Sequence, residues 1–465
     1  MSTGREKSKN LNIAYIGGGS KGWAWGLMSD LALEGSLSGT VKLYDLKYEA
    51  AQRNAMIGNR LNHRDDVTGK WNYEAVPTIE EALQGADFII ISILPGTFEE
   101  MHSDVHLPEE YGIYQSVGDT VGPGGLVRAL RTIPMYVEFA NAIKQHAPNA
   151  WVINYTNPMS LCTRTLYEVF PEIKAIGCCH EVFGTQQLLA SMVEEKLGLP
   201  KVNRREIKVN VLGINHFTWL NKASYRELDL FPLYREFVER YYEEGFEGTK
   251  KGHWLNDHFS SAQRVKFDLF RKYDVIAAAG DRHLAEFMPH AWYLKDPETV
   301  REWKFSLTKV DWRKEYAKEL SQKSDRLASG EEQFELKATG EEGIDMIKAL
   351  LGLGELVTNV NMPNRGQHAG LPEGAVVETN AIFGYDSVQP VVSGQLPAPV
   401  NNLVLHHVYN QETTLQAALE NNAEMAFRAF VNDPLVYHLA PQEARSLFDR
   451  MLDNTKAYLP GWAGK

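Results

Sequence analysis

Cysteine is scarce in this sequence of 465 residues and occurs only as Cys162, Cys178 and Cys179. So few cysteines argue against a disulfide framework and favour a reducing, intracellular environment. Because adjacent residues of a strand point to opposite faces, Cys178 and Cys179 should have different roles. We expect one of these thiols to pack in the core while the other faces a cleft.

Two further absences narrow the function. Basic residues are outnumbered, with 48 Lys and Arg against 60 Asp and Glu and a net charge of −12, which gives no support for nucleic-acid binding. The first ten residues, MSTGREKSKN, lack the apolar stretch of a signal peptide, and no run approaches the length of a membrane span. We therefore expect a cytoplasmic protein with no nucleic-acid partner and no membrane partner.

The first 200 residues alternate between apolar strands and helices. Strands are predicted at 11–16, 41–45, 86–94, 150–158 and 173–179, and helices at 23–33, 48–61, 126–146 and 183–197. This alternation favours an α/β fold with a Rossmann-like, doubly wound parallel sheet.

After about residue 200 the pattern becomes mixed. Further strands are predicted at 374–384 and 388–392, and helices at 231–242, 261–273 and 410–430. A chain of this length is too long for one ordinary core. We expect a nucleotide-binding domain at 1–200, a mixed α/β substrate domain at 201–465, and an active site at their interface.

A glycine-rich turn follows the first predicted strand and opens a helix. Gly17, Gly19 and Gly22 match the pattern G-x-G-x-x-G in the context that dinucleotide binding requires, with Ser20 in the same turn. Asp45 ends the second strand, where a carboxylate binds the adenosine ribose and favours NAD over NADP. The alternative is a tight turn without a nucleotide, and the nicotinamide fold by itself would also fit a 2-hydroxy-acid dehydrogenase.

Four more stretches stand out, and together they resemble one family. They are GDTVGPGGLVRALRTIP (118–134), INYTNPM (153–159), GCCHEV (177–182) and GINHFTW (213–219), joined by the carboxy-terminal pattern VVETNA, SGQLP and NDPLV. The set resembles family 4 glycoside hydrolases, an NAD-dependent exception among glycosidases. Its Cys-His-Glu-Val is similar to the signature of the α-galacturonidases. The resemblance implies an architecture like that of lactate and malate dehydrogenases.

The resemblance implies a metal site with Cys179 as thiolate and His216 as imidazole. Mn²⁺ is the metal it implies, although these two ligands would also suit other transition metals. Taken singly, His216 would more often be a core histidine, and Cys179 an inert buried thiol.

The same resemblance implies an unusual route for breaking a glycosidic bond. NAD⁺ takes hydride from C3 of the sugar, a base removes the C2 proton, and the aglycone leaves by elimination. Water then adds and the hydride returns, so no net redox change occurs.

The base is expected in the stretch KFDLFRKYD (266–274). We assign it to Asp268, with Arg271 one turn later as a substrate contact and Tyr273 as the reserve candidate for the base. An ordinary surface ion pair between Asp268 and Arg271 is the alternative interpretation.

Further candidates follow the ends of the predicted strands. Asp119 and Asn157 match positions near the metal and the sugar hydroxyls, and Asn154 lies nearer the nicotinamide; turn formation is the alternative role for all three. Where some relatives carry an acid, this chain has His180, which would contact the substrate or protonate the leaving oxygen. Glu181 would orient His180 or bind a basic side chain.

A uronate carboxylate needs a cation. Arg282, together with His283, is the candidate, and a solvated loop is the alternative. Arg128 and Arg131 would secure their loop or reach an anion.

The sequence thus predicts an α-galacturonidase that uses NAD and Mn²⁺ on short oligogalacturonides, small-molecule uronic acid glycosides. Rival hypotheses are the same machinery acting on other α-glycosides, an NAD-dependent hydroxy-acid dehydrogenase, and a non-catalytic NAD sensor. The family resemblance also implies a homo-oligomer, a dimer or a tetramer.

Overall fold

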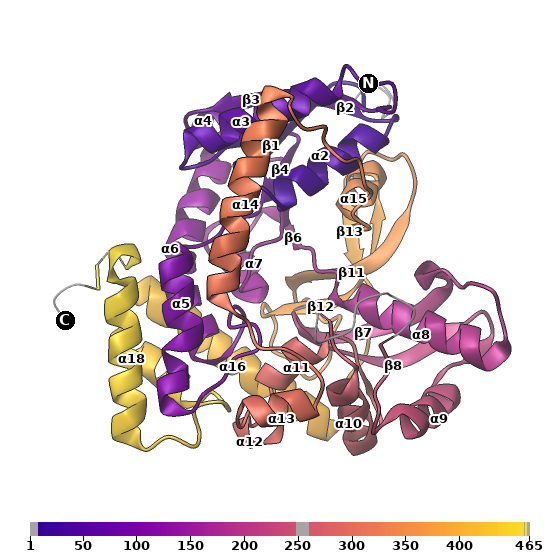
Figure 1. Cartoon of the computed structure of the whole chain (residues 1–465), viewed down its shortest axis with the longest axis vertical. Helices are drawn as coiled ribbons and strands as arrows, with labels where there is room; N and C mark the ends of the chain where they lie inside the picture. The colour runs from indigo at the N-terminus through magenta and orange to yellow at the C-terminus, as the bar shows by residue number, and fades with distance from the viewer. Residues whose placement is uncertain (1–7, 248–259, 460, 463–465) are drawn as a thin grey trace.

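The computed structural model describes residues 8–247, 260–459 and 461–462, and its main feature is a nine-stranded sheet (Figure 1). Six parallel strands lie in the order β6-β5-β4-β1-β2-β3, which is the doubly wound order of dinucleotide-binding sheets and confirms the predicted fold. These strands are β1 (Leu11–Ile16), β2 (Ser38–Tyr44), β3 (Lys70–Val76), β4 (Phe88–Ile91), β5 (Trp151–Asn154) and β6 (Lys174–Gly177).

Three antiparallel strands from the second half of the chain extend this sheet. They are β11 (Leu356–Pro363), β12 (Val376–Gly384) and β13 (Ser387–Pro390), and β11 joins β6 where Asn361 lies opposite Gly177. The two halves of the chain therefore share one sheet. The division at residue 200 stays a prediction.

Helices cover both faces of the large sheet because its strands are apolar on both sides. One face packs against α2 (Trp23–Leu33), α3 (Tyr48–Leu61), α14 (Val310–Ser329) and α15 (Gly343–Leu350). The other face packs against α4 (Ile79–Leu83), α6 (Gly122–His146) and α7 (Met159–Val169). In Figure 1, α14 runs from α3 at the top of the molecule down to α5 (Phe98–His106), and it contacts both helices.

A second, smaller sheet carries the other half of the core. It contains β7 (Ile207–Ile214), β8 (Phe217–Tyr225), β9 (Leu228–Asp229) and β10 (Ile276–Ala277). Apolar residues of α8 (Glu181–Leu197) and α9 (Phe231–Tyr241) pack with one set of its side chains. A second cluster includes α11 (Asp281–Glu286), α13 (Pro297–Glu302), α16 (Ala398–Glu420), α17 (Ala423–Val431) and α18 (Pro441–Thr455). The helix α10 (Arg264–Tyr273) contributes to both clusters, and α12 (His290–Tyr293) follows α11.

The single helix predicted at 410–430 is wrong, because the chain breaks it between α16 and α17. Asn421 adopts a left-handed conformation with φ of 51°, which ends α16, and the side chain of Asn422 accepts a hydrogen bond from Met425 N and caps α17. Asparagine is favoured in both positions, so the pair of asparagines was the local signal for the break.

The long helices pack on the sheets and on one another. Within the described ranges, no helix combines the length and the apolar character needed to cross a membrane.

A buried ion pair anchors the middle of α6. Arg131 donates two hydrogen bonds to the carboxylate of Asp104 on α5, and its Nε donates to Pro95 O at 2.9 Å. Both side chains are almost completely excluded from solvent. The sequence left open whether Arg131 secures its loop or reaches an anion. These contacts give it a structural role.

Replacing Arg131 by Met should destabilise the protein by about 3–5 kcal/mol, because the Asp104 carboxylate would stay buried without its cation. Chemical denaturation monitored by circular dichroism measures this loss. The exposed pair Lys456–Asp453 gives the control, since Lys456→Met should change stability by less than about 1 kcal/mol. Equal losses in the two variants would contradict the structural role of Arg131.

Candidate active site and metal centre

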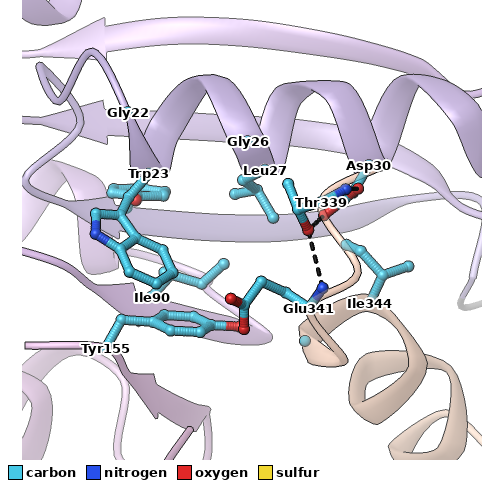
Figure 2. A pocket seen from close by; sticks show the side chains of 12 residues that line it. Gly22, Trp23, Gly26, Leu27, Asp30, Ile90, Tyr155, Thr339, Glu341 and Ile344 are labelled. Carbon is cyan, nitrogen blue, oxygen red and sulfur yellow. Dashed lines mark hydrogen bonds between the residues drawn. The ribbon is translucent and has the colours of Figure 1, made fainter. Parts of the chain in front are cut away.

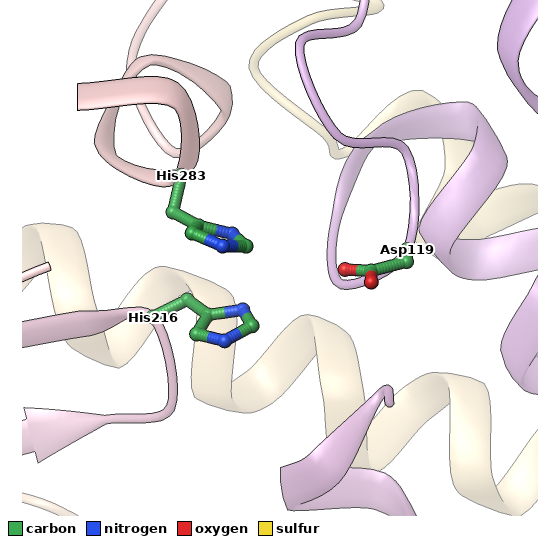
Figure 3. A group of neighbouring side chains, drawn as sticks. All are labelled: Asp119, His216 and His283. Atoms are coloured by element: carbon green, nitrogen blue, oxygen red, sulfur yellow. The ribbon is translucent and has the colours of Figure 1, made fainter. Parts of the chain in front are cut away.

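Asp119, His216 and His283 converge at one point although they come from three distant segments (Figure 3). Each offers one ligand atom, and these atoms all lie within 4.8 Å of one another. Asp119 lies in the loop before α6, His216 in the turn between β7 and β8, and His283 on α11. The two imidazole rings lie against each other with centroids 3.6 Å apart and planes tilted by 31°. One carboxylate and two imidazoles in this arrangement are a donor set for a divalent cation.

The turn that carries His216 is strained. Residues Asn215 and His216 connect β7 to β8, and His216 has φ of 64°, a left-handed conformation that non-glycine residues seldom adopt. Such strain clusters at functional sites, where the surrounding structure holds it in place. The turn directs the ring of His216 toward Asp119 (Figure 3).

Hydrogen bonds select the nitrogen that His216 offers. Thr120 Oγ1 donates to Asp119 Oδ1 at 2.7 Å and lies 2.8 Å from His216 Nδ1. Because the single hydroxyl proton points to the carboxylate, His216 Nδ1 carries the proton and donates to Thr120. The lone pair of Nε2 is then available to a cation, as in metal-binding histidines fixed by a second hydrogen bond.

The protonation states of the three residues suit a cation. Burial, followed by the neighbouring His283, lowers the pKa of His216 to about 3, and burial also lowers the pKa of His283. Burial alone would raise the pKa of Asp119, but Arg128, His216 and His283 bring it down to about 2. His283 Nδ1 is buried and has no hydrogen-bond partner among the described residues. Two neutral imidazoles, one with an unpartnered nitrogen, and one carboxylate therefore fit a divalent metal ion.

Glu181 links this group to His180. Its Oε2 accepts a hydrogen bond from Gly280 N at 2.7 Å, and its Oε1 lies 3.7 Å from His283 Nε2 and 4.0 Å from His180 Nε2. Burial would raise the pKa of Glu181, but His283, His216 and His180 lower it to about 2. Glu181 thus orients His283 from the side opposite to the unpartnered Nδ1.

His180 lies at the rim of the group. Its Nδ1 is 2.9 Å from Glu341 Oε1, and about half of its side chain, 52%, is exposed. The hydrogen bond with Glu341 raises the pKa of His180 against the effect of burial. His180 is thus a partly exposed side chain whose cationic form is stabilised, in a position to meet an anion.

Cys179 lies near Asp119, His216 and His283. Among the described residues, its sulfur is not one of the ligand atoms that converge there. Its thiol contacts the side chain of Asn215, the residue before His216, and its carbonyl accepts from Asn359 Nδ2 at 3.1 Å. Burial, then the charges of Glu378 and Glu181, raises the pKa of the thiol well above its ordinary value. Cys178 packs in the large core cluster. The ligand pair Cys179 and His216 stays a prediction.

The other predicted residues fall into two groups. Asn157 and Asn154 lie close to the site: Asn157 Nδ2 donates to Asp119 Oδ2 at 3.3 Å, and Asn154 accepts from Tyr136 and from Thr156 N. Arg271 instead forms an ion pair with Glu239 at 3.3 Å and stacks on the ring of Tyr242.

Asp268 and Arg282 are both engaged in the interior. Asp268 accepts from Tyr242 OH at 2.8 Å, from Tyr293 OH and from Lys272. Arg282 donates to Ser306 O at 3.0 Å, to Ser116 O and to Thr308 Oγ1. These contacts give both residues structural partners. Their assignments as base and as substrate contact stay predictions, as does that of Tyr273, whose ring packs edge-on against Trp219.

The glycine-rich turn has the geometry expected for close approach of a backbone. Gly17 has φ of 93°, and a Cβ there would lie 2.0 Å from Ser92 O on the neighbouring strand end. Gly19 N donates to Asp45 Oδ2 at 3.0 Å, Gly22 N lies 3.4 Å from Ser20 Oγ, and Gly22 precedes α2. The turn therefore leaves the first residues of α2 open to an anion such as a pyrophosphate.

A cavity of about 300 Å³ begins at Gly22 (Figure 2). Its walls include Trp23 and Tyr155, whose ring centroids are 5.1 Å apart, and Glu341, whose backbone N donates to Thr339 Oγ1 at 3.0 Å. Glu341 also contacts His180, so one wall residue of the cavity is in direct contact with the histidine at the rim of the three-ligand group.

Two family models match most of the chain. The model described as family 4 glycosyl hydrolase matches residues 12–195, and that of the family 4 glycosyl hydrolase C-terminal domain matches residues 211–436. An α-galacturonidase of Thermoanaerobacterium saccharolyticum is 66% identical over 98% of this chain and 98% of its own length. An α-galacturonidase of Bacillus subtilis is 57% identical over 95% of this chain and 97% of its own length.

Solved structures have the same fold. A crystal structure of a Bacillus subtilis protein, 56% identical, superposes with a TM-score of 0.91 and covers 96% of this chain and 100% of that one. A 6-phospho-α-glucosidase from gut microorganisms, in complex with NAD and Mn²⁺, has a TM-score of 0.79 and 20% identity, and covers 97% and 99% of the two chains. At that identity the second likeness shows the fold alone.

Two single variants test which ligand set binds a cation. His283→Ala should weaken Mn²⁺ binding by about ten-fold or more, because it removes one of three converging donors. Cys179→Ser tests the predicted thiolate in the same titration, and Cys178→Ser is its control in the core. Binding is measured from the free Mn²⁺ signal in electron paramagnetic resonance. Wild-type affinity in His283→Ala would remove His283 from the ligand set.

Proposed function

The chain belongs to family 4 of the glycosyl hydrolases, and we propose that it is an α-galacturonidase that removes terminal α-linked galacturonic acid from short oligogalacturonides. The observation that carries this proposal is the 66% identity, over 98% of both chains, with a protein named α-galacturonidase. The group of Asp119, His216 and His283 and the NAD-type glycine turn both support it.

NAD and Mn²⁺ are the proposed cofactors. The turn of Gly17, Gly19, Ser20 and Gly22 would hold the pyrophosphate of NAD, with Asp45 toward the ribose. The cavity between Trp23 and Tyr155 offers apolar surface next to that turn for the nicotinamide half. Asp119, His216 and His283 would hold the metal ion, with Cys179 close by.

When bound, the two cofactors supply hydride acceptance at C3 of the sugar and polarisation of its C3 oxygen. The residues of this chain bind and orient the sugar. Asn157 contacts Asp119, and its buried Oδ1 has no hydrogen-bond partner among the residues that the structure describes, so it is placed to meet a sugar hydroxyl. Glu181 and Thr120 hold the two imidazoles so that their free nitrogens face the same space. Asp268 stays the predicted base.

His180 is the proposed partner of the uronate. It is partly exposed, its cationic form is stabilised by Glu341, and it stands next to the carboxylate that orients His283. A histidinium can form a charge-assisted hydrogen bond with a carboxylate, which a neutral sugar cannot offer. His180 keeps about half of its side chain exposed, whereas Arg282 is buried and Arg271 pairs with Glu239, so His180 is the better-placed cation.

A substrate panel tests the function. Nitrophenyl α-glycosides are incubated with the enzyme, NAD⁺, Mn²⁺ and a thiol reductant, and nitrophenol release is followed by absorbance. We expect fast release from the galacturonide and little from the glucoside, galactoside and glucuronide. NADH should not accumulate, because the hydride returns to the sugar in each cycle. Fast cleavage of a neutral glycoside alone, or NADH formed in proportion to product, would overturn the proposal in favour of its rivals.

A binding experiment tests the role of His180. In His180→Asn the preference for galacturonate over galactose should fall by about ten-fold, the equivalent of one charge-assisted hydrogen bond. The two dissociation constants are measured by isothermal titration calorimetry in the presence of NAD⁺ and Mn²⁺. The control is His438→Asn. In the wild type His438 is another exposed histidine, and it stacks on His290. An unchanged preference would assign the carboxylate to another cation.

A cytoplasmic location and a homo-oligomeric state are part of the same proposal. They follow from the family and from the low cysteine content, and size-exclusion chromatography with light scattering measures the second.

A further inference from the structure

A buried carboxylate one helical turn beyond His283 connects α11 to the loop that carries Asp119. Glu286 ends α11 and is completely buried. Its Oε1 accepts hydrogen bonds from Val117 N at 2.7 Å and from Gly118 N at 2.9 Å. These are the two residues that immediately precede Asp119. One oxygen of Glu286 therefore satisfies both backbone donors beside a ligand.

A second set of bonds joins the same two segments. Ser116 Oγ donates to Arg282 O at 2.5 Å, and Arg282 in turn donates to Ser116 O. Arg282 precedes His283 on α11, as Ser116 precedes the residues held by Glu286. The helix and the loop are thus joined by hydrogen bonds on both sides of His283 and on the N-terminal side of Asp119.

The loop has little room to move away from this contact. Gly118 has φ of 74°, and a Cβ there would lie 2.9 Å from Val105 Cγ2 and 3.1 Å from Gln115 Nε2. Because the loop is packed this closely, its position is set by the hydrogen bonds that anchor it. Removing Glu286 would leave two buried N–H groups without an acceptor, and the loop would have to shift to find water.

We infer that Glu286 is a positioning residue that sets the spacing between Asp119 and His283 and thereby the affinity of the site for a divalent cation. The inference rests on the proposed metal centre and does not depend on which sugar the enzyme cleaves. Glu286 acts through the backbone of the Asp119 loop and through its own helix, without contacting the cation.

The chain offers a matched control in Asp433. This carboxylate is also buried and also accepts from two backbone N–H groups, those of Gly122 at 2.9 Å and Leu435 at 2.9 Å. Gly122 lies in the same loop region, at the start of α6, but the two backbone partners of Asp433 do not belong to α11. Loss of Asp433 therefore reproduces the general cost of losing a buried acceptor, while leaving the link to His283 intact.

The test is a Mn²⁺ titration of the full-length protein, read from the free Mn²⁺ signal in electron paramagnetic resonance, together with a thermal melt of each variant. Glu286→Ala should weaken Mn²⁺ binding by about ten-fold, the lower end of what loss of a supporting contact around a metal site costs. The Mn²⁺ affinity of Glu286→Gln should stay within about three-fold of that of the wild type, because the amide oxygen can accept both N–H bonds. Asp433→Ala should lower the melting temperature by about as much as Glu286→Ala does. Its Mn²⁺ affinity should stay within about three-fold of that of the wild type.

Wild-type Mn²⁺ affinity in Glu286→Ala, or an equal loss of affinity in Asp433→Ala, would overturn the inference. If Glu286→Ala does not fold, Glu286→Asp replaces it, since the shorter side chain keeps a carboxylate but draws it back from Val117 N and Gly118 N, and unchanged affinity there would overturn the inference as well. A wild-type protein that binds no Mn²⁺ refutes the metal centre and this inference together. A wild-type protein that binds Mn²⁺ but does not cleave galacturonides refutes only the proposed substrate.

Discussion

The site depends on keeping buried polar groups paired where three distant segments meet. Asp119, His216 and His283 lie where the loop before α6, the β7–β8 turn and α11 come together. An unpaired charge or donor in such a place costs several kcal/mol. The structure meets this demand by giving each imidazole a partner on one side, Thr120 for His216 and Glu181 for His283, which leaves the facing nitrogens for a cation.

The surrounding acids divide into two kinds. Arg128 and two histidines hold the pKa of Asp119 at about 2 in spite of burial, and three histidines do the same for Glu181. Glu286 and Glu378 accept hydrogen bonds but have weaker cationic support, and burial raises their pKa values to about 8 and about 7. The first pair faces the site and the second pair supports its walls, Glu286 through the Asp119 loop and Glu378 through Asn215 and Asn359.

The second half of the chain enters the site from two directions. Strands β11 and β12 extend the nucleotide-binding sheet and bring Asn359 and Glu378 next to Cys179 and Asn215. The segment before α15 brings Glu341 to His180 across the cavity at Gly22. Residues more than a hundred positions away in the chain therefore contact Cys179, Asn215 and His180.

Local patterns in the sequence were enough for the doubly wound sheet and the glycine turn. Each depends on residues close together in the chain: apolar strands between helices, and glycines at Gly17 and Gly22. The tertiary structure alone decided that His283 joins Asp119 and His216, that Arg282 and Asp268 are engaged by buried partners, and that Glu286 supports the Asp119 loop. These contacts join positions far apart in the sequence, and no local periodicity or spacing encodes which buried donor will meet which acceptor.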